Sequence, residues 1–220
     1  MTTKYPKIQT IFKRGEKKKI IEGEWTLPEF EYLQNNEWIG TEKIDGTNIR
    51  IGWEYDKKFV TLDGRTENAQ LSSILVNHLI RKFPRDRFDI FEHDIGLYGE
   101  GFGQGIQGKF GKAYTEGYLS SFLDCDDKNG FILFDVKIDT YWLKREDVMD
   151  IGSKLNIPVV PEVFRGTLLE AVELCKTGFQ STLGKIIAEG LVLKPAVEIC
   201  KRGGGRLIAK LKVKDFKCNG

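Results

Sequence analysis

A short polar string, Glu42-Lys43-Ile44-Asp45-Gly46-Thr47-Asn48, contains the residues of this sequence that are best suited to chemistry. A lysine amine is a nucleophile once it is neutral, and a turn two residues later can hold it beside a phosphate. The string also has a purely structural interpretation, because Asp-Gly between alternating apolar residues is typical of a hairpin turn. Residues 38–43 and 49–53 would then be the two strands. Taken alone, the string favours the hairpin, and only other residues can decide whether it also serves catalysis.

Further charged residues stand inside segments that are otherwise apolar, namely Glu100, Asp135, Glu189, Lys210 and Lys212. A charge in such a segment is costly unless it is paired or used. Lys210 and Lys212 are two positions apart, so on a strand both side chains would point to the same face. Each residue alone could be an ordinary outward-facing charge. Together they indicate a functional site.

Composition and length restrict the class of protein. The chain has 220 residues, of which 40% are hydrophobic and 30% charged, and no apolar run reaches the roughly 18 residues of a membrane helix. The first ten residues lack the apolar core of a secretory signal, so we expect an intracellular, cytoplasmic protein with no membrane partner. Four scattered cysteines and two histidines make a zinc site unfavourable. We expect a hard metal, Mg²⁺ or Mn²⁺, bound by carboxylate and phosphate oxygens.

Periodicity and turn residues predict an irregular mixture of helices and strands. Residues 26–29 resemble a capping box that opens a short helix to about residue 35. The other segments with clear patterns are strands at 59–62, 95–100, 131–138, 159–164, 186–193 and 207–213, and helices at 71–83, 144–155 and 168–176. Hairpin signals together with irregularly placed helices favour an α+β fold built on antiparallel sheets with flanking helices. We expect residues 1–220 to form one domain.

Two further features are of the kind found at nucleotide or nucleic-acid sites, and each also has a simpler interpretation. Residues 103–108 fit the pattern G-x-G-x-x-G, but no convincing helix start follows, so a surface loop is favoured over a dinucleotide site. Residues 201–220 contain seven basic residues and one acidic residue, a net charge of +6 that leaves −4 for the rest of the chain. A basic end indicates either an anionic partner or a solvated terminus.

In order along the chain, six blocks resemble the covalent nucleotidyltransferases, the superfamily of ATP-dependent DNA ligases, RNA ligases and mRNA capping enzymes. The superfamily has an ATP-grasp-like catalytic fold. The blocks are Lys43-Ile44-Asp45-Gly46, Asp63-Gly64-Arg65-Thr66, Tyr98-Gly99-Glu100, Phe134-Asp135, Glu189-Gly190-Leu191-Val192-Leu193-Lys194 and Lys210-Leu211-Lys212. Single blocks are weak signals, whereas six in the right order are strong. Gly46-Thr47-Asn48 is most similar to the RNA ligase 2-like family, although Asp45 stands where some RNA ligases carry histidine.

The resemblance implies a role for each block. Lys43 is implied as the nucleophile that attacks the α-phosphate of ATP, with Lys210 and Lys212 as catalytic and ATP-binding cations. Neighbouring cations favour the neutral amine that attack requires. Glu189 and Asp135 are implied as metal ligands. The other implied ATP-binding residues are Glu42, Asn48, Arg65, Glu100 and Phe134. For Phe134, stacking on adenine and ordinary core packing are almost evenly matched, since apolar residues precede it.

The resemblance predicts an ATP-dependent RNA ligase that carries AMP on a lysine, adenylates an RNA 5′-phosphate and joins it to a 3′-hydroxyl. The alternatives are a DNA ligase that seals nicks, a capping enzyme, and a non-catalytic nucleotide- or RNA-binding relative. We expect a monomer without an appended OB-fold. RNA would be held by basic segments such as 81–87 and 201–206, or by an accessory nucleic-acid-binding partner.

Overall fold

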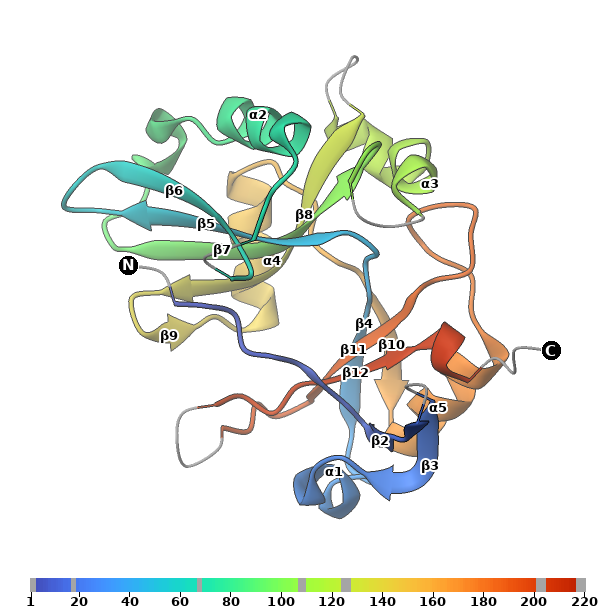
Figure 1. Cartoon of the computed structure of the whole chain (residues 1–220). Helices are drawn as coiled ribbons and strands as arrows, with labels where there is room; N and C mark the ends of the chain where they lie inside the picture. The colour runs from blue at the N-terminus through green and yellow to red at the C-terminus, as the bar shows by residue number, and fades with distance from the viewer. Residues whose placement is uncertain are drawn as a thin grey trace. The chain divides into compact units, whose positions relative to one another are not determined.

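The computed structural model describes residues 3–16, 19–66, 69–106, 110–123, 128–200 and 205–216. Its α+β architecture, with antiparallel sheets and few helices, confirms the predicted fold class (Figure 1). The chain divides into two compact units. Unit 1 comprises Met1–Tyr5 and Asp45–Val160, and unit 2 comprises Pro6–Ile44 and Pro161–Gly220. None of the helices in the described ranges is long and apolar enough to cross a membrane.

Unit 1 is built on a five-stranded antiparallel sheet with the strand order β6-β5-β7-β8-β9. Its strands are β5 (Thr47–Glu54), β6 (Phe59–Gly64), β7 (Ile95–Gly103), β8 (Asn129–Ile138) and β9 (Tyr141–Trp142). Its helical elements are α2 (Ser73–Lys82), α3 (Gly111–Thr115), α4 (Arg145–Lys154) and the 3₁₀ turns η2 (Arg85–Phe88) and η3 (Tyr118–Phe122).

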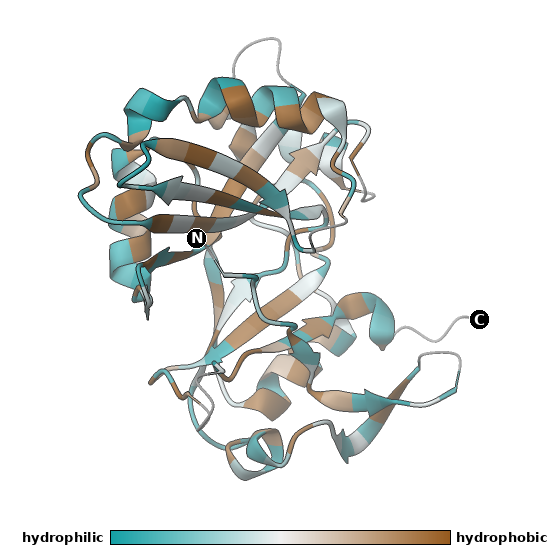
Figure 2. Ribbon diagram, turned by 60° about the vertical axis from the view of Figure 1, so that its left-hand side comes forward, coloured by the Kyte–Doolittle hydropathy of each residue, from teal (hydrophilic) through white to brown (hydrophobic). Residues whose placement is uncertain are grey.

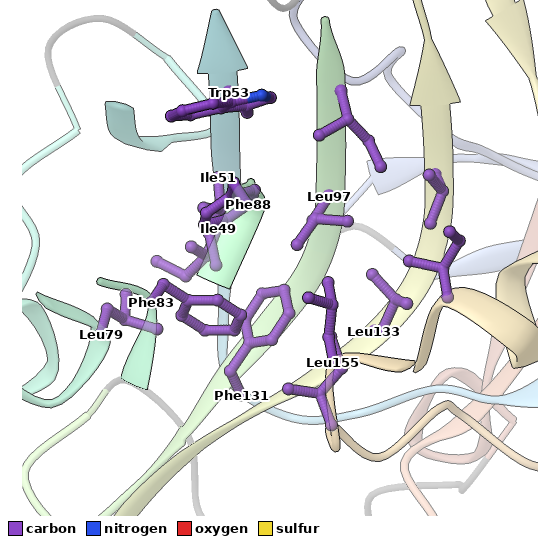
Figure 3. Packing of buried hydrophobic residues seen from close by; sticks show 14 of the residues in the cluster. Ile49, Ile51, Trp53, Leu79, Phe83, Phe88, Leu97, Phe131, Leu133 and Leu155 are labelled. Atoms are coloured by element: carbon purple, nitrogen blue, oxygen red, sulfur yellow. The ribbon is translucent and has the colours of Figure 1, made fainter. Parts of the chain in front are cut away.

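One face of this sheet holds the core of unit 1. Alternation along β5 places Ile49, Ile51 and Trp53 on that face, where all three are fully buried (Figure 3). Leu75 and Leu79 of α2 and Val148 of α4 belong to the same cluster, which accounts for the packing of both helices on the sheet. Figure 2 colours the strands by hydropathy, and in β5 hydrophobic residues alternate with polar residues or glycine, as a sheet with one apolar face requires. The other face, called the open face below, lies away from this core and carries polar and aromatic side chains.

A β-bulge in β8 changes which residues reach that other face. Tyr98 of β7 lies opposite Asp135, but its neighbour Gly99 lies opposite Leu133, so Phe134 is the extra residue of β8. A bulge of this kind interrupts the two-residue alternation. Leu133 and Val136 consequently both lie in the core. Phe134 and Asp135 instead contact Tyr5 and lie on the opposite face.

Unit 2 contains a second five-stranded sheet in the order β1-β12-β11-β4-β10 and a two-stranded sheet of β2 and β3. Only β1 and β12 pair in parallel among these described strands. The strands are β1 (Gln9–Thr10), β2 (Phe12–Arg14), β3 (Ile20–Trp25), β4 (Trp38–Glu42), β10 (Glu162–Gly166), β11 (Gly190–Pro195) and β12 (Ala209–Lys212). The helical elements are α1 (Pro28–Tyr32), α5 (Leu168–Thr177) and η4 (Val213–Asp215).

The core of unit 2 forms on the face of the sheet that α5 covers. Trp38, Leu191, Leu193 and Leu211 contribute from the strands, and α5 contributes Leu168, Ala171, Val172 and Cys175. The α5 helix begins with a capping box in which Thr167 and Glu170 exchange hydrogen bonds, and these bonds lower the pKa of Glu170. Alternation then places Lys210 and Lys212 of β12 on the opposite face from buried Ala209 and Leu211.

The predicted hairpin across Asp45-Gly46 is wrong. β4 pairs with β10 and β11 in unit 2, whereas β5 pairs with β6 and β7 in unit 1. Neither Asp45 nor Gly46 has the positive φ that the usual two-residue hairpin turn needs. Instead, the Asp45 amide donates to the Tyr114 hydroxyl at 3.2 Å, and Gly46 lies so close to Gly101 that a Cβ would meet its carbonyl oxygen at 2.2 Å. The glycine is required by this close approach.

Several smaller predictions also differ from the structure. The strand predicted at 186–193 begins only at Gly190, and a short helix, α3, begins at Gly111, where no helix was predicted after the glycine pattern. The α1 helix begins after Leu27 and ends at Tyr32, and no side chain caps it, so residues 26–29 do not form a capping box. The strand predicted at 159–164 begins later, at Glu162, because Val159 makes only an isolated bridge to Leu133. Gln107 and Gly108 of the glycine pattern, and Lys201, Arg202 and Lys217 of the basic end, lie outside the described residues.

Candidate active site

The Lys43 side chain meets a carboxylate at the end of β4. Its Nζ donates to Glu189 Oε2 at 2.6 Å and to the Ile44 carbonyl at 3.2 Å. The Lys43 backbone amide donates to the Gly190 carbonyl at 2.8 Å, which extends the pairing of β4 with β11 by one residue. Only 19% of the Lys43 side chain is exposed. The amine is therefore held at a defined place rather than moving freely in solvent.

The other oxygen of the Glu189 carboxylate contacts a second lysine. Lys212 Nζ lies 2.5 Å from Glu189 Oε1, and the glutamate side chain is 7% exposed. Lys210 lies two residues earlier on the same face of β12 and is half-buried. The structure thus brings Lys43, Glu189 and Lys212 together, as the sequence predicted for one site. The nearly buried carboxylate is therefore not left as an unpaired charge, which would be strongly destabilising.

Gly190 explains how Glu189 reaches both lysines. Its φ of +155° is one that residues with side chains rarely adopt, and a Cβ at this position would lie 2.0 Å from the Leu211 carbonyl oxygen. The Val213 amide donates to the Glu189 carbonyl at 2.9 Å, so the glutamate backbone is anchored to the residue that follows β12. Glycine at 190 therefore permits the close approach of β11 and β12 that positions the carboxylate.

Glu42 points away from Lys43 and is buried, with 1% of the residue exposed. Its Oε1 accepts a hydrogen bond from the Ser181 hydroxyl at 2.5 Å. Its Oε2 accepts bonds from the Thr182 amide at 3.0 Å and the Thr182 hydroxyl at 2.9 Å. Sequence reasoning missed Ser181 and Thr182. The sequence contains only an indirect signal. Glu42 lies on the same face of β4 as buried Trp38, and a buried carboxylate needs hydrogen-bond donors from other parts of the chain.

In unit 1, Asn48 and Glu100 are cross-strand partners on β5 and β7. Both are half-buried and share the face opposite the core. The Asn48 Oδ1 atom is buried and has no hydrogen-bond partner among the described residues. A buried polar atom without a partner is costly, so this oxygen is suited to accept a bond from a ligand.

Phe134 and Asp135 lie on the same open face of the unit 1 sheet. The Asp135 carboxylate, 1% exposed, accepts a hydrogen bond from the Tyr5 hydroxyl at 2.7 Å. The Tyr5 ring contacts the Phe134 ring edge to face, with centroids 5.0 Å apart. Phe134 is half-buried and absent from the core cluster, so it is not an ordinary core residue. Sequence reasoning did not identify Tyr5, because nothing local links it to residue 135.

Arg65 is exposed and directly follows β6. The half-buried arginine of this region is Arg50, whose side chain is 12% exposed and lies 3.0 Å from Asp63. Arg50 of β5 lies opposite Asp63 of β6 on one side and opposite Tyr98 of β7 on the other. Tyr98 in turn lies opposite Asp135 of β8. Burial raises the pKa of the Tyr98 hydroxyl. A row of polar side chains thus crosses the open face of the sheet.

The donor set for a metal is small. Among the described residues, no group of three or more histidine, cysteine, aspartate or glutamate side chains could hold an ion. Glu189 offers one carboxylate beside Lys43, and this fits Mg²⁺ or Mn²⁺, because such ions are held by one or two carboxylates together with waters and phosphate oxygens. Asp135, the second predicted ligand, belongs to unit 1 and is bonded to Tyr5.

A family model described as RNA ligase matches residues 36–212. The chain belongs to the RNA ligase family. The matched region contains all six blocks that carry the resemblance, which confirms the predicted family. A search of the curated proteins finds no match to this chain.

Solved structures show the same fold. An alanine variant of Naegleria gruberi RNA ligase with ATP and Mn matches with a TM-score of 0.62 at 19% identity, covering 97% of this chain and 64% of that one. The same enzyme with PPi matches with a TM-score of 0.61 at 19% identity, and the match covers 96% of this chain and 62% of that one. A further alanine variant of that enzyme, with ATP and Mn, matches with a TM-score of 0.61 at 18% identity, and the match covers 84% of this chain and 52% of that one. The chain therefore spans between about half and two thirds of these structures.

Proposed function

We propose that this chain is an ATP-dependent RNA ligase that forms a lysyl-AMP intermediate on Lys43. The observation that carries the proposal is the arrangement of Lys43, Glu189 and Lys212, in which a nearly buried amine lies 2.6 Å from a carboxylate that also holds a second lysine. Membership of the RNA ligase family supports the substrate class. The solved neighbours with ATP and Mn support ATP and a divalent metal as the reactants.

In the first step, Lys43 Nζ attacks the α-phosphorus of ATP. The N–P bond forms while the bond from that phosphorus to pyrophosphate breaks, and pyrophosphate leaves with the electron pair. The amine loses a proton to solvent in this step. Lys210 and Lys212, on one face of β12, would offset negative charge on the phosphates.

Lys43 must be neutral to attack, and its Nζ donates to the Glu189 carboxylate at 2.6 Å, so this bond has to break before the amine reaches phosphorus. Glu189 therefore has to be drawn away from the amine, and the second cation on the same carboxylate, Lys212, provides an alternative partner. When bound to Glu189, Mg²⁺ or Mn²⁺ would supply further positive charge beside the phosphates. Glu189 is the metal-binding residue that we carry forward, because its carboxylate is bonded to Lys43, whereas the Asp135 carboxylate is bonded to Tyr5.

Unit 1 carries other residues that we propose for ATP binding. Asn48 has a buried oxygen without a hydrogen-bond partner among the described residues, Glu100 lies opposite it, and half-buried Phe134 would contact the base. Arg65, being exposed, can reach a bound anion. Glu42 belongs to unit 2, where its buried carboxylate, bonded to Ser181 and Thr182, would hold the end of β4 next to Lys43 rather than touch the base. Asp135 would support Phe134 rather than bind a metal.

The next two steps use the RNA ends. An oxygen of the RNA 5′-phosphate attacks the AMP phosphorus, the N–P bond breaks, and Lys43 recovers a proton. The 3′-hydroxyl of the second RNA end then attacks the 5′-phosphorus and loses its proton to solvent, the bond from that phosphorus to AMP breaks, and AMP leaves with the electron pair. Both ends must be held in line with the transferred phosphate for this exchange to occur.

Part of the basic segment 81–87 is occupied by structural bonds and is less suited to hold RNA than predicted. Lys82 Nζ donates to the Phe122 carbonyl at 3.3 Å. Arg87 donates to the carbonyls of Lys82 and Leu155, and burial lowers its pKa. We therefore propose weak, salt-sensitive RNA binding by a monomer, with an accessory partner supplying further contacts.

Strand joining tests the proposal. Nicked duplex RNA, nicked duplex DNA and single-stranded RNA, each with a 5′-phosphate and a 3′-hydroxyl, are incubated with ATP and Mg²⁺ or Mn²⁺. We expect joining of RNA with ATP but not with GTP, and none with Lys43→Arg. Lys185→Arg, at an exposed lysine of the same unit, is the matched control and should keep full activity. Joining of nicked DNA alone would replace the RNA assignment, and joining by Lys43→Arg would overturn the mechanism.

A further inference from the structure

The segment Thr3–Tyr5, called the strap below, lies on the open face of the unit 1 sheet. The Tyr98 hydroxyl donates to the Thr3 carbonyl at 2.7 Å, and Lys137 Nζ donates to the Thr3 hydroxyl at 3.1 Å. Tyr5 is only 8% exposed. The strap is thus fixed to β7 and β8 at several points, and Pro6, the next residue, already belongs to unit 2.

Tyr5 is bonded to the two residues of β8 that carry the resemblance to the base-binding block. Its hydroxyl donates to Asp135 Oδ2 at 2.7 Å, and both residues are buried. Its ring contacts Phe134 at 5.0 Å with an angle of 70° between the planes. It also contacts Tyr98 at 5.5 Å and Trp142 at 5.6 Å. One side chain therefore sets the surroundings of both Phe134 and Asp135.

The bulge in β8 explains why such a support is needed. Phe134 is the extra residue, so no residue of β7 lies opposite it. A residue at a bulge is not held by the regular ladder, and its direction depends on side-chain contacts. The ring of Tyr5, itself held by the hydrogen bond to Asp135, provides that contact.

We propose that Tyr5 is a positioning residue for nucleotide binding, which orients Phe134 through ring contact and Asp135 through its hydroxyl. This inference rests on the proposed function, because it assumes that Phe134 contacts the base. Tyr5 acts before the chemical step and touches no reacting atom. Its loss should therefore weaken ATP binding much more than it slows transfer from bound ATP.

The test measures the rate of self-adenylation over a range of ATP concentrations. Tyr5→Phe keeps the ring and removes only the hydroxyl, and we expect the KM for ATP to rise about 10-fold while kcat stays within about 2-fold. Tyr5→Ala removes the ring as well and should raise the KM further. Tyr141→Phe is the matched control, because Tyr141 lies on β9 of the same sheet with 75% of its surface exposed. It should leave both constants unchanged.

A double-mutant cycle identifies the route of the effect. If the hydroxyl acts through Asp135, then Tyr5→Phe in an Asp135→Asn background should change the KM by less than about 2-fold, because coupled residues are not additive. An unchanged KM in Tyr5→Phe, a fall confined to kcat, or full additivity with Asp135→Asn would each overturn the inference. These outcomes presuppose an adduct in the wild type. Absence of that adduct would instead reject the proposed function.

Discussion

Lys43 Nζ lies 2.6 Å from Glu189 Oε2, although the two residues are 146 positions apart in the chain. The other oxygen of the same carboxylate lies 2.5 Å from Lys212 Nζ. This places one negative charge between two amines, in a place where the carboxylate is nearly buried. The relationship makes the positions of both amines depend on Glu189.

Glu189→Gln tests that dependence. The amide keeps the size of the side chain but removes the charge that pairs with Lys43 and Lys212. Losing one electrostatic element of a reaction site typically slows the step by about 10²–10³-fold. We expect the rate of self-adenylation at saturating ATP to fall by that order.

The control for this variant is Glu162→Gln. Glu162 lies on β10 of the same unit, where it is exposed and pairs with Arg165 at 3.0 Å. Exposed pairs contribute little, so we expect unchanged adenylation. Equal loss in the two variants would mean that Glu189 has no special place in the site.

Replacing Gly190 by alanine should destabilise the protein and misplace Glu189. The φ of +155° is unfavourable for alanine, and the Cβ would meet the Leu211 carbonyl oxygen at 2.0 Å. We expect a loss of about 3 kcal/mol or more in the free energy of unfolding, measured by urea denaturation.

Gly23→Ala separates the two causes of that loss. Gly23 also has a positive φ, +86°, but nothing lies within 4 Å of a Cβ there. It should lose only about 1–2 kcal/mol from backbone strain. If both variants lose the same amount, the close approach of β11 and β12 does not contribute.

Ser181→Ala removes one donor from the buried Glu42 carboxylate. Glu42 keeps the two bonds from Thr182, so we expect a loss of about 1–3 kcal/mol in unfolding free energy rather than misfolding. Ser153→Ala, at an exposed position of α4, should stay within about 0.5 kcal/mol of the wild type. Thermal denaturation of the two variants gives the comparison, and equal stabilities would show that the Ser181 bond is not used.

The thiols of Cys175 and Cys200 should differ in reactivity. Cys175 is fully buried in the unit 2 core, and burial raises its pKa to about 12. At pH 8 its thiolate fraction would be roughly 10⁻⁴, and only the thiolate reacts. Cys200 is exposed. Alkylation of the folded protein, followed by peptide mapping, should label Cys200 and leave Cys175 unlabelled. Equal labelling of both would contradict the packing of α5.

Much of the fold could be predicted from periodicity alone. Apolar spacing located α2, α4 and α5 within a residue or two, because each helix buries one stripe of side chains. The partner of β4 could not be predicted in this way. Asp45-Gly46 is a local turn signal, whereas the pairing of β4 with β10 and β11 depends on residues more than a hundred positions away.

For the candidate site, too, residues in local motifs could be predicted from the sequence, whereas residues that contact them from distant parts of the chain could not. Lys43, Glu189 and Lys212 were identified because each stands in a recognisable block. Tyr5 and Ser181 carry no such pattern, and their partners Asp135 and Glu42 lie 130 and 139 positions away. Contacts of this kind arise only from tertiary packing, which neither propensity nor a short motif encodes.

Mapping a covalent AMP adduct tests the central claim most directly. The purified chain is incubated with ATP and Mg²⁺ or Mn²⁺, denatured, weighed by intact mass spectrometry and digested for peptide mapping. We predict one AMP per chain, attached to Lys43, together with release of pyrophosphate and no adduct in Lys43→Arg. An adduct on another residue, an adduct in Lys43→Arg, or an unmodified wild-type chain would contradict the account.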